Sequence, residues 1–314
     1  MIYIFFTFWI ISAVLMLRET KIARIIIYLG IFSLVGSTGY LMLGSPDVAM
    51  AEAAASAFMV IFFLVCFQKY YSLTDSQMES KAGAKKKILS FQTLVPMGFA
   101  AALFMLFIYF VPDAEVSTYL RDRYVEAFVR DVGGTNPVTA IYLGYRVYDT
   151  LFEALIVVIS VLAAMHLSAF SDDPKVTEHH SDMEKSGMAV FAIQIICPIM
   201  LLFGAYLILN GHITPGGGFQ GGLAVASFFI CRYMIYDVND LPIGKLNRME
   251  EIVFVGITIF AVSIIFFGAA TYLPDHILPV FQVAYLTVMN LLIGLKVACG
   301  FIILFYRYIV IEQR

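Results

Sequence analysis

Long apolar runs separated by short polar segments dominate the chain, and their lengths give the first prediction. A helix needs about 20 mostly apolar residues to cross the hydrocarbon core of a bilayer. By that measure the chain is an all-α, polytopic membrane helical bundle. Its first span is short, and its fifth and ninth spans are long enough to tilt or to contain an irregular turn. We predict nine spans, at residues 2–17, 25–43, 47–68, 88–111, 138–168, 188–210, 218–236, 251–273 and 279–309.

The composition agrees with a membrane protein and excludes other classes. Of the 314 residues, 61% are hydrophobic and 14% are charged, whereas soluble domains carry roughly 25% charged residues. The 28 Phe, 18 Tyr and 15 Met residues exclude a disordered chain. A net charge of −3 offers no basic face for nucleic acid. We therefore expect a lipid bilayer around the chain and no nucleic-acid partner.

The positions of Lys and Arg predict the orientation in the membrane. With nine spans, 15 of the 20 basic residues fall on the side that holds the C-terminus, and three fall on the opposite side. Because cytoplasmic loops are enriched in Lys and Arg, we place the N-terminus outside and the C-terminus in the cytoplasm of a cell membrane. We expect the first apolar segment to stay as a span, because no cleavage region follows it.

Two polar linkers, 69–87 and 169–187, divide the chain into helical blocks. The blocks are a three-helix segment at 1–70, a two-helix segment at 88–170 and a four-helix domain at 185–314. The outer segment 112–134 mixes aromatic and charged residues, which predicts a short helix at the membrane interface. The sequence has no evident internal repeat, so a stand-alone carrier built from inverted repeats is not supported.

No cofactor or metal ligand set is visible in the sequence. The four cysteines lie in apolar runs without a C-x-x-C motif, which is typical of small side chains in helix packing. His179 and His180 lie in a charged linker that we interpret as solvated. We therefore predict no resident cofactor or metal and no enzymatic activity in this chain, with any redox catalysis in partner subunits.

Ionisable residues inside the predicted spans carry most of the functional information, because each is costly there. Asp47 follows Pro46 at the start of the third span, where it is either a helix cap or an ion-path carboxylate. Glu52 lies about 7–8 Å further along the helix, below any capping position. Flanking alanines let a neighbouring helix come close, so Glu52 is either a functional carboxylate or part of a structural ion pair.

The fifth span contains Arg146, Asp149 and Glu153, spaced to share one helix face. Arg146 can pair with Asp149, but one arginine cannot neutralise two acids. Glu153 is therefore the better candidate for reversible protonation, although a structural triad remains an alternative. In the last span, Lys296 lies too deep to reach the interface easily, so it either pairs with a carboxylate or loses its proton.

A glycine-rich stretch, residues 210–222, joins the sixth and seventh spans. Irregular backbone of this kind is tolerated at membrane depth only where protein or water covers it, so we expect the turn to be buried. His212 within it is either a hydrogen-bonded structural residue or a proton relay. The positions to which we assign a structural role are Pro46, Pro215, Gly216, Gly217, Gly218, Phe219, Gln220, Gly221, Gly222, Asn290 and Gly294.

These motifs resemble a known family. Residues 185–310, with the glycine stretch 211–222 and the stretch 290–297, resemble the MnhB/MrpB-type subunit of Mrp cation/proton antiporters. Residues 1–70, with SPDVAMAE at 45–52, resemble the region that follows the large antiporter-like part of the MrpA-type protein. Residues 88–170, with NPVTAI at 136–141 and RVYDTLFE at 146–153, resemble the next segment of that protein. In membrane-bound hydrogenases these regions correspond to the small D-, E- and F-type proteins, which this chain resembles joined in order.

The resemblance implies a small-subunit component of an Mrp-type complex that exchanges Na⁺ for H⁺, with other antiporter subunits and hydrogenase-like or oxidoreductase subunits as partners. It implies that the ion route contains Asp47, Glu52, Asp149, Glu153, His212 and Lys296. We expect no transport by the chain alone, because the large antiporter-like domain of the family is absent from its 314 residues.

One hypothesis for the route follows. The third and fifth spans, with the glycine turn, line a hydrated half-channel in which Glu52 and Glu153 bind a proton or Na⁺ alternately. Arg146 tunes Asp149, Thr150 offers a further oxygen ligand, and Lys296 gates transfer. The alternative is a non-conducting scaffold that positions neighbouring antiporter and redox subunits.

Overall fold

The computed structural model describes residues 2–71, 118–169, 187–236, 241–267 and 278–309, with a few residues between 98 and 109. Regular structure in these ranges is helical, and they contain no strand. Most of the predicted span 88–111 lies outside the described residues. The linker histidines His179 and His180 lie outside them as well.

The other eight predicted spans overlap with described helices. The helices are α1 (Ile2–Arg18), α2 (Ile22–Met42), α3 (Pro46–Tyr71), α6 (Tyr119–Asp131), α7 (Pro137–Ala140), the π-helix η1 (Ile141–Tyr145), α8 (Val147–Ala169), α9 (Gly187–Asn210), α10 (Gly218–Tyr236), α11 (Ile243–Phe267) and α12 (Leu278–Ile309).

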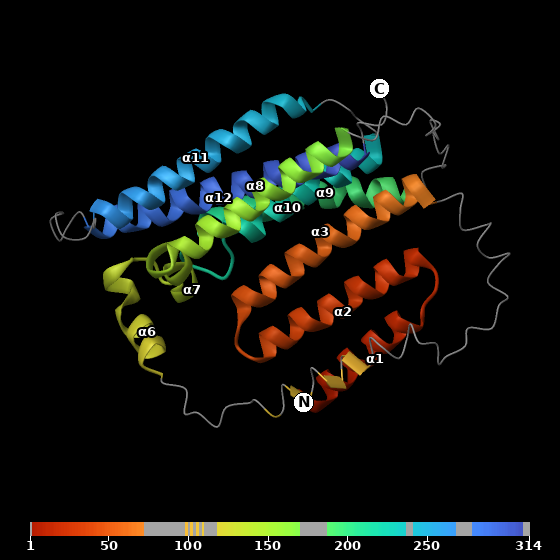
Figure 1. Cartoon of the computed structure of the whole chain (residues 1–314), viewed down its shortest axis with the longest axis horizontal. Helices are drawn as coiled ribbons and strands as arrows, with labels where there is room; N and C mark the ends of the chain where they lie inside the picture. Colours follow the sequence, from red (N-terminus) through yellow and green to blue (C-terminus); the bar gives the residue numbers. More distant parts are fainter. Residues whose placement is uncertain are drawn as a thin grey trace.

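Helix α12 is the centre of the bundle (Figure 1). The most apolar 18-residue segment within Leu278–Tyr308 is 67% buried, whereas the corresponding segments of the other four apolar helices of spanning length are at most 33% buried. Helices α8, α10 and α11 pack against α12, α9 and α3 pack against α10, and α2 and α1 follow as outer layers. The core cluster therefore draws its buried side chains from α3, η1, α8, α10, α11 and α12.

Five described helices are long and apolar enough to cross a membrane. They match the predicted second, third, fifth, sixth and ninth spans, while Phe5–Arg18 of α1 is a shorter apolar helix. The boundary of the eighth span was wrong: α11 begins at Ile243 rather than at residue 251. Its first turns carry Lys245 and Arg248 on an exposed side, so a helix that is polar on one face there was mistaken for a loop.

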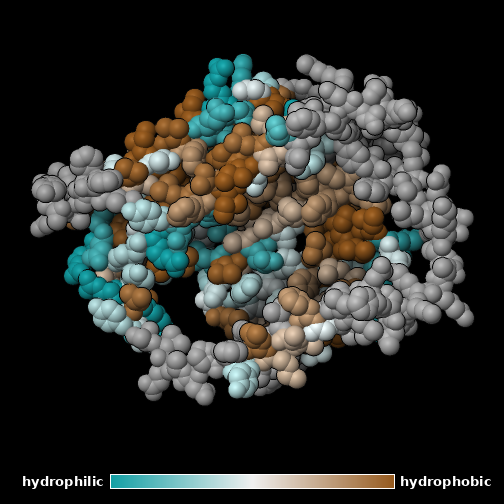
Figure 2. All heavy atoms as spheres, viewed as in Figure 1, coloured by the Kyte–Doolittle hydropathy of each residue, from teal (hydrophilic) through white to brown (hydrophobic). Residues whose placement is uncertain are grey.

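The surface agrees with a bilayer environment. Apolar side chains stay exposed along the outer helices, for example Ile252 at 63%, Ile259 at 61% and Leu202 at 72%. Hydrophilic side chains gather around α6, at the end of the molecule that also holds α7 (Figure 2). The predicted interfacial helix within 112–134 is present as α6, and Gln282 ties its last turn to α12 through the carbonyls of Arg130 and Asp131.

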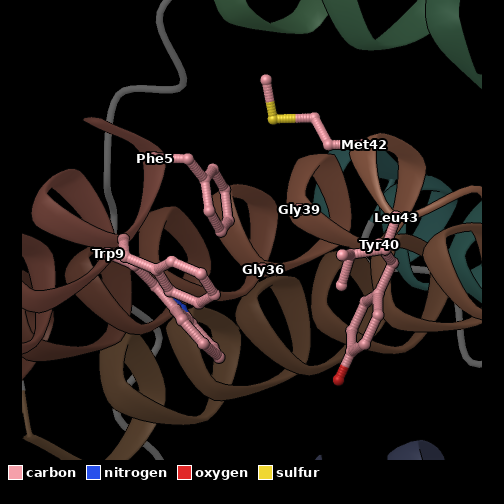
Figure 3. A pocket seen from close by; sticks show the side chains of 8 residues that line it. Phe5, Trp9, Gly36, Gly39, Tyr40, Met42 and Leu43 are labelled. Carbon is pink, nitrogen blue, oxygen red and sulfur yellow. The ribbon is translucent and has the colours of Figure 1, made fainter. Parts of the chain in front are cut away.

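Helix α1 packs on α2 through aromatic side chains over small residues. The Trp9 indole N–H donates to the Phe32 carbonyl at 3.2 Å, and the two rings stack. Gly36 and Gly39 line a small apolar pocket beneath Phe5 and Trp9 (Figure 3). A Cβ at Gly39 would lie 2.3 Å from the Phe5 ring, so any larger residue there would require the ring to move.

Candidate functional site

Buried polar groups from four segments of the chain meet where α3, α7 and α10 begin. We call this cluster the polar junction. Most of its side chains are almost fully buried, with Asp47 8%, Asn136 5%, Thr139 0% and Asn290 0% exposed. Its members are Asp47, Asn136, Thr139, Tyr142, Asn290 and the glycine turn 211–218.

Asn136 holds the junction together. Its side-chain oxygen accepts the Val138 N–H at 3.0 Å and so caps α7. Its amide nitrogen donates to Asp47 Oδ1 at 2.9 Å and to the carbonyls of Gly211 and Thr214 at 3.1 Å each. One side chain therefore starts a helix and binds two distant segments.

Asp47 accepts hydrogen bonds from other segments. Besides Asn136, the backbone N–H of Gly216 donates to its Oδ1 at 3.2 Å. The carboxylate therefore anchors the glycine turn to the start of α3. Both donors lie outside α3, so these hydrogen bonds do not cap that helix.

The third part of the junction centres on Asn290 of α12. Its Oδ1 accepts the Tyr142 hydroxyl at 3.0 Å and the Gly218 N–H at 3.1 Å. Thr139 completes the cluster by donating to the Gly211 carbonyl at 2.6 Å. These contacts link the fifth span, the glycine turn and the last helix.

The glycine turn is buried, as predicted, and close approach explains its composition. Gly217 has φ +149°, and a Cβ there would lie 2.5 Å from the Tyr142 hydroxyl. Gly218 and Gly222 bring α10 onto the backbone of α12, where added Cβ atoms would lie 2.6 Å from the carbonyls of Asn290 and Gly294. Any side chain at these positions would separate the two helices.

Two buried nitrogen atoms in this region have no hydrogen-bond partner among the described residues, His212 Nδ1 and Asn290 Nδ2. The His212 backbone carbonyl is satisfied, because it accepts the N–H groups of Thr135 and Asn136. The residue is 9% exposed. His212 is therefore held inside the junction by its backbone, while its ring Nδ1 has no hydrogen-bond partner among the described residues.

The fifth span contains the irregular turn that its length allowed. Residues Ile141–Tyr145 form a π-helix, and Arg146 leaves helical geometry before α8 begins. The Thr150 hydroxyl donates to the Tyr142 carbonyl at 2.6 Å, and the Tyr285 hydroxyl donates to the Leu143 carbonyl at 2.9 Å. Side-chain hydroxyls thus bond the carbonyls that the π-turn leaves without helical partners. Single π-turns of this kind are frequent at functional sites.

The predicted pair in this span is formed. Arg146 Nη2 lies 2.5 Å from Asp149 Oδ2, with exposed side-chain fractions of 60% and 55%. Glu153 is exposed on the same helix, next to Phe152 at 63% and Ile156 at 64%. Thr150 is 3% exposed and faces the bundle instead. Thr150 therefore does not join the two carboxylates as a ligand set within this chain.

Glu52 lies between α2 and α3. The buried Ser33 hydroxyl of α2 donates to Glu52 Oε1, and Ser37 of α2 donates to the Ala49 carbonyl at 2.7 Å. The main contacts of α3 run to α2, α10 and α12, whereas those of α8 run to η1, α11 and α12. Glu52 and Glu153 therefore belong to different helix interfaces, and the described chain does not bring them together.

Lys296 has a carboxylate partner that the sequence did not identify. Its Nζ contacts Glu250 Oε1 of α11, with side-chain exposures of 0% and 3%. The centre of the Phe254 ring lies 5.3 Å from the same Nζ. Glu250 was missed because it was assigned to the loop before the eighth span. The sequence did hold a signal for this pair, because a lysine deep in one span needs an acidic partner and Glu250 lies near the start of the preceding, antiparallel helix.

Three uncharged residues were missed for a related reason. Thr139, Tyr142 and Ser33 are uncharged, so the cost of burial did not single them out, and only their partners reveal their place. Within the described ranges no three His, Cys, Asp or Glu residues are placed to hold a metal ion.

Family comparison matches both ends of the chain. Residues 188–303 match the MnhB model, described as a domain related to the MnhB subunit of Na⁺/H⁺ antiporters. Residues 7–71 match the MbhD model, which describes the D-type protein of the membrane-bound hydrogenase MBH. The chain joins an MbhD-like segment to an MnhB-like domain. The MbhD-like segment supplies Asp47 and Glu52, and the MnhB-like domain supplies the glycine turn, Asn290 and the Glu250–Lys296 pair.

Relatives and solved structures agree with this assignment. A probable K⁺/H⁺ antiporter A/B protein of Rhizobium meliloti (strain 1021) is 24% identical over 231 residues, which cover 67% of this chain and 23% of that protein. A chain of the Mrp complex from Dietzia sp. DQ12-45-1b has the same fold, with TM-score 0.63 and 17% identity over 95% of this chain and 34% of that one. A chain of the membrane-bound sulfane sulfur reductase, an archaeal respiratory membrane complex, has TM-score 0.51 and 23% identity over 68% of this chain and 93% of that one.

These matches leave two predictions as they were. The MbhD-like and MnhB-like matches stop short of the middle of the chain, so the E-like character of residues 88–170 stays a prediction. The domain boundaries stay predictions as well. The match covers about a quarter of the Rhizobium protein, so the activity of that whole protein cannot be assigned to this chain from the match.

Proposed function

We propose that this chain is a membrane component of a multi-subunit Mrp-type cation/proton antiporter module and contributes to its Na⁺/H⁺ translocation path. The carrying observation is that Glu52 and Glu153 lie in apolar helices without a cationic partner among the described residues. A charge at the bilayer centre costs about 2.5–3.5 kcal/mol on insertion scales, so such residues normally face protein or water and serve function.

The proposed route begins at the polar junction. Asp47 and Asn136 hold the backbone, and Glu52 lies five positions after Asp47, about 7–8 Å along α3. His212 Nδ1 offers a proton-exchanging nitrogen inside the same end of the bundle. Glu52 and Glu153 bind the proton or cation at separate interfaces, in place of the shared half-channel that the sequence suggested.

The exposed face of α8 supports a multi-subunit assembly. The Arg146–Asp149 pair and Glu153 point away from this chain among apolar side chains such as Tyr148 and Phe152. Charged groups do not face lipid, so another polypeptide covers them in the complex that we propose. Other Mrp-type antiporter subunits are the proposed neighbours, with hydrogenase-like or oxidoreductase subunits as further partners that carry any redox chemistry.

Ion exchange in membrane vesicles that contain the intact complex tests the proposal. Glu52→Gln and Glu153→Gln keep the shape of each side chain and remove its charge. We expect the variant complexes to assemble and to lose Na⁺-dependent proton movement at least tenfold, with K⁺ measured in parallel because one relative is a probable K⁺/H⁺ antiporter component. Glu126→Gln, on the exposed surface of α6, is the matched control. Wild-type exchange in both variants would contradict the proposal.

A scaffold function is the second candidate, and the hydrogen bonds that Asp47 accepts from two other segments favour it. A carboxylate that already accepts from Asn136 and Gly216 acts as a structural anchor. The scaffold alternative expects Glu52→Gln and Glu153→Gln to reduce the yield of the assembled complex, with normal exchange per assembled complex.

A further inference from the structure

A fully buried ion pair joins α11 and α12 in the half of the bundle opposite the polar junction. Lys296 and Glu250 have side-chain exposures of 0% and 3%. The glycine turn lies at the start of α10, which is 19 residues long, about 28 Å. Helix α11 starts beyond the other end of α10, and Glu250 is only about 10 Å along it (Figure 1).

An apolar layer separates the pair from the junction. Asn290 precedes Lys296 by six residues, about 9 Å of helix. Ile293 and Val297 of α12 and Ile257 of α11 are buried core residues around this stretch. The pair therefore cannot be part of the hydrogen-bond network that Asp47 and Asn136 organise.

Stability does not explain the pair. The cost of removing two charges from water is commonly as large as the attraction gained, so replacing a buried ion pair by apolar residues is often neutral or stabilising. The surroundings of the pair are apolar, because the Phe254 ring centre lies 5.3 Å from Lys296 Nζ and Ile257 of the same helix is a buried core residue. The charges therefore need a reason other than holding α11 against α12.

We propose that Glu250 and Lys296 form a second proton-exchanging station, which serves the half of the membrane opposite the polar junction; this rests on the function proposed above. A proton that arrives from that side binds a Glu250 carboxylate oxygen and breaks the ion pair. The Lys296 ammonium then loses its counter-charge in an apolar environment and gives up one proton to the next acceptor. The proton on Glu250 then moves to the neutral Lys296 amine, which restores the ion pair. One proton therefore enters and one leaves in each cycle.

Two variants separate this role from a structural one in the intact complex. Glu250→Gln combined with Lys296→Met removes both charges together and leaves no unpaired charge buried. Lys296→Arg keeps the ion pair but installs a group that stays protonated. We expect both complexes to assemble and to lose Na⁺-dependent proton movement at least tenfold. Glu251→Gln, an exposed neighbour of Glu250, is the control with normal exchange.

Each other outcome counts against the proposal. Normal exchange in the doubly neutral variant or in Lys296→Arg would show that the pair is structural. Failure of both variants to assemble would show the same. The two proposals can fail separately. If Glu52→Gln and Glu153→Gln keep normal exchange while Lys296→Arg loses it, the route through the first two acids is wrong and the station stands.

Discussion

The Asn136 side-chain amide donates to the Asp47 carboxylate at 2.9 Å, across 89 positions of sequence. This contact connects the MbhD-like segment with the middle of the chain, and Gly216 extends it into the MnhB-like domain. A buried carboxylate that is bound from two sides fixes the relative position of three segments. The fused chain is held together at this end by polar contacts as well as by apolar packing.

Removing Asn136 tests that contact. Asn136→Ala removes one donor each from the Asp47 carboxylate and from the carbonyls of Gly211 and Thr214. A buried polar group left unsatisfied costs about 1–3 kcal/mol. We expect the purified complex to release this chain when heated to a lower temperature than the wild type needs. Asn247→Ala, which removes an exposed amide that bonds Glu251, should leave the temperature unchanged. Equal behaviour of the two variants would contradict the role of the junction.

Gly217→Ala tests the close approach at the glycine turn. The new Cβ would lie 2.5 Å from the Tyr142 hydroxyl, at a φ of +149° that L side chains rarely adopt. We expect the turn to shift and the yield of the assembled complex to fall severalfold. Gly244→Ala is the comparison, because nothing lies within 4 Å of a Cβ there. A normal yield for Gly217→Ala would show that the turn has room to adapt.

The outer face of α8 predicts a neighbouring polypeptide. A photo-crosslinking amino acid in place of Phe152, whose side chain is 63% exposed beside Glu153, should attach to another protein of the complex. Mass spectrometry of the product identifies that protein. Products that contain only lipid would mean that Glu153 faces the bilayer, and the proposed assembly on this face would be wrong.

The packing of α9 on α10 brings two cysteines together. The thiols of Cys197 and Cys231 lie near enough to influence each other. A membrane-permeant bifunctional reagent such as dibromobimane should therefore link them and become fluorescent, and Cys197→Ser should abolish the signal. Fluorescence that depends instead on Cys66 or Cys299 would contradict this arrangement of α9 and α10.

Much of the architecture could be predicted from the lengths of the apolar runs, because the thickness of the bilayer sets the same minimum length for every spanning helix. The Arg146–Asp149 pair was predictable from spacing alone, since both residues belong to one helix. The Glu250–Lys296 pair was not, because its members lie 46 positions apart and the polar first turns of α11 resembled a loop. Which helix faces Glu52 depends on tertiary packing, so the shared channel inferred for Glu52 and Glu153 is not found within the described part of this chain.

The most direct measurement is the rate of Na⁺-driven proton movement by assembled Glu52→Gln complex, normalised to the amount of this chain present. Our account predicts normal assembly and at least a tenfold slower rate, because a neutral amide cannot bind and release a proton. A normalised rate equal to that of the wild type would contradict the account.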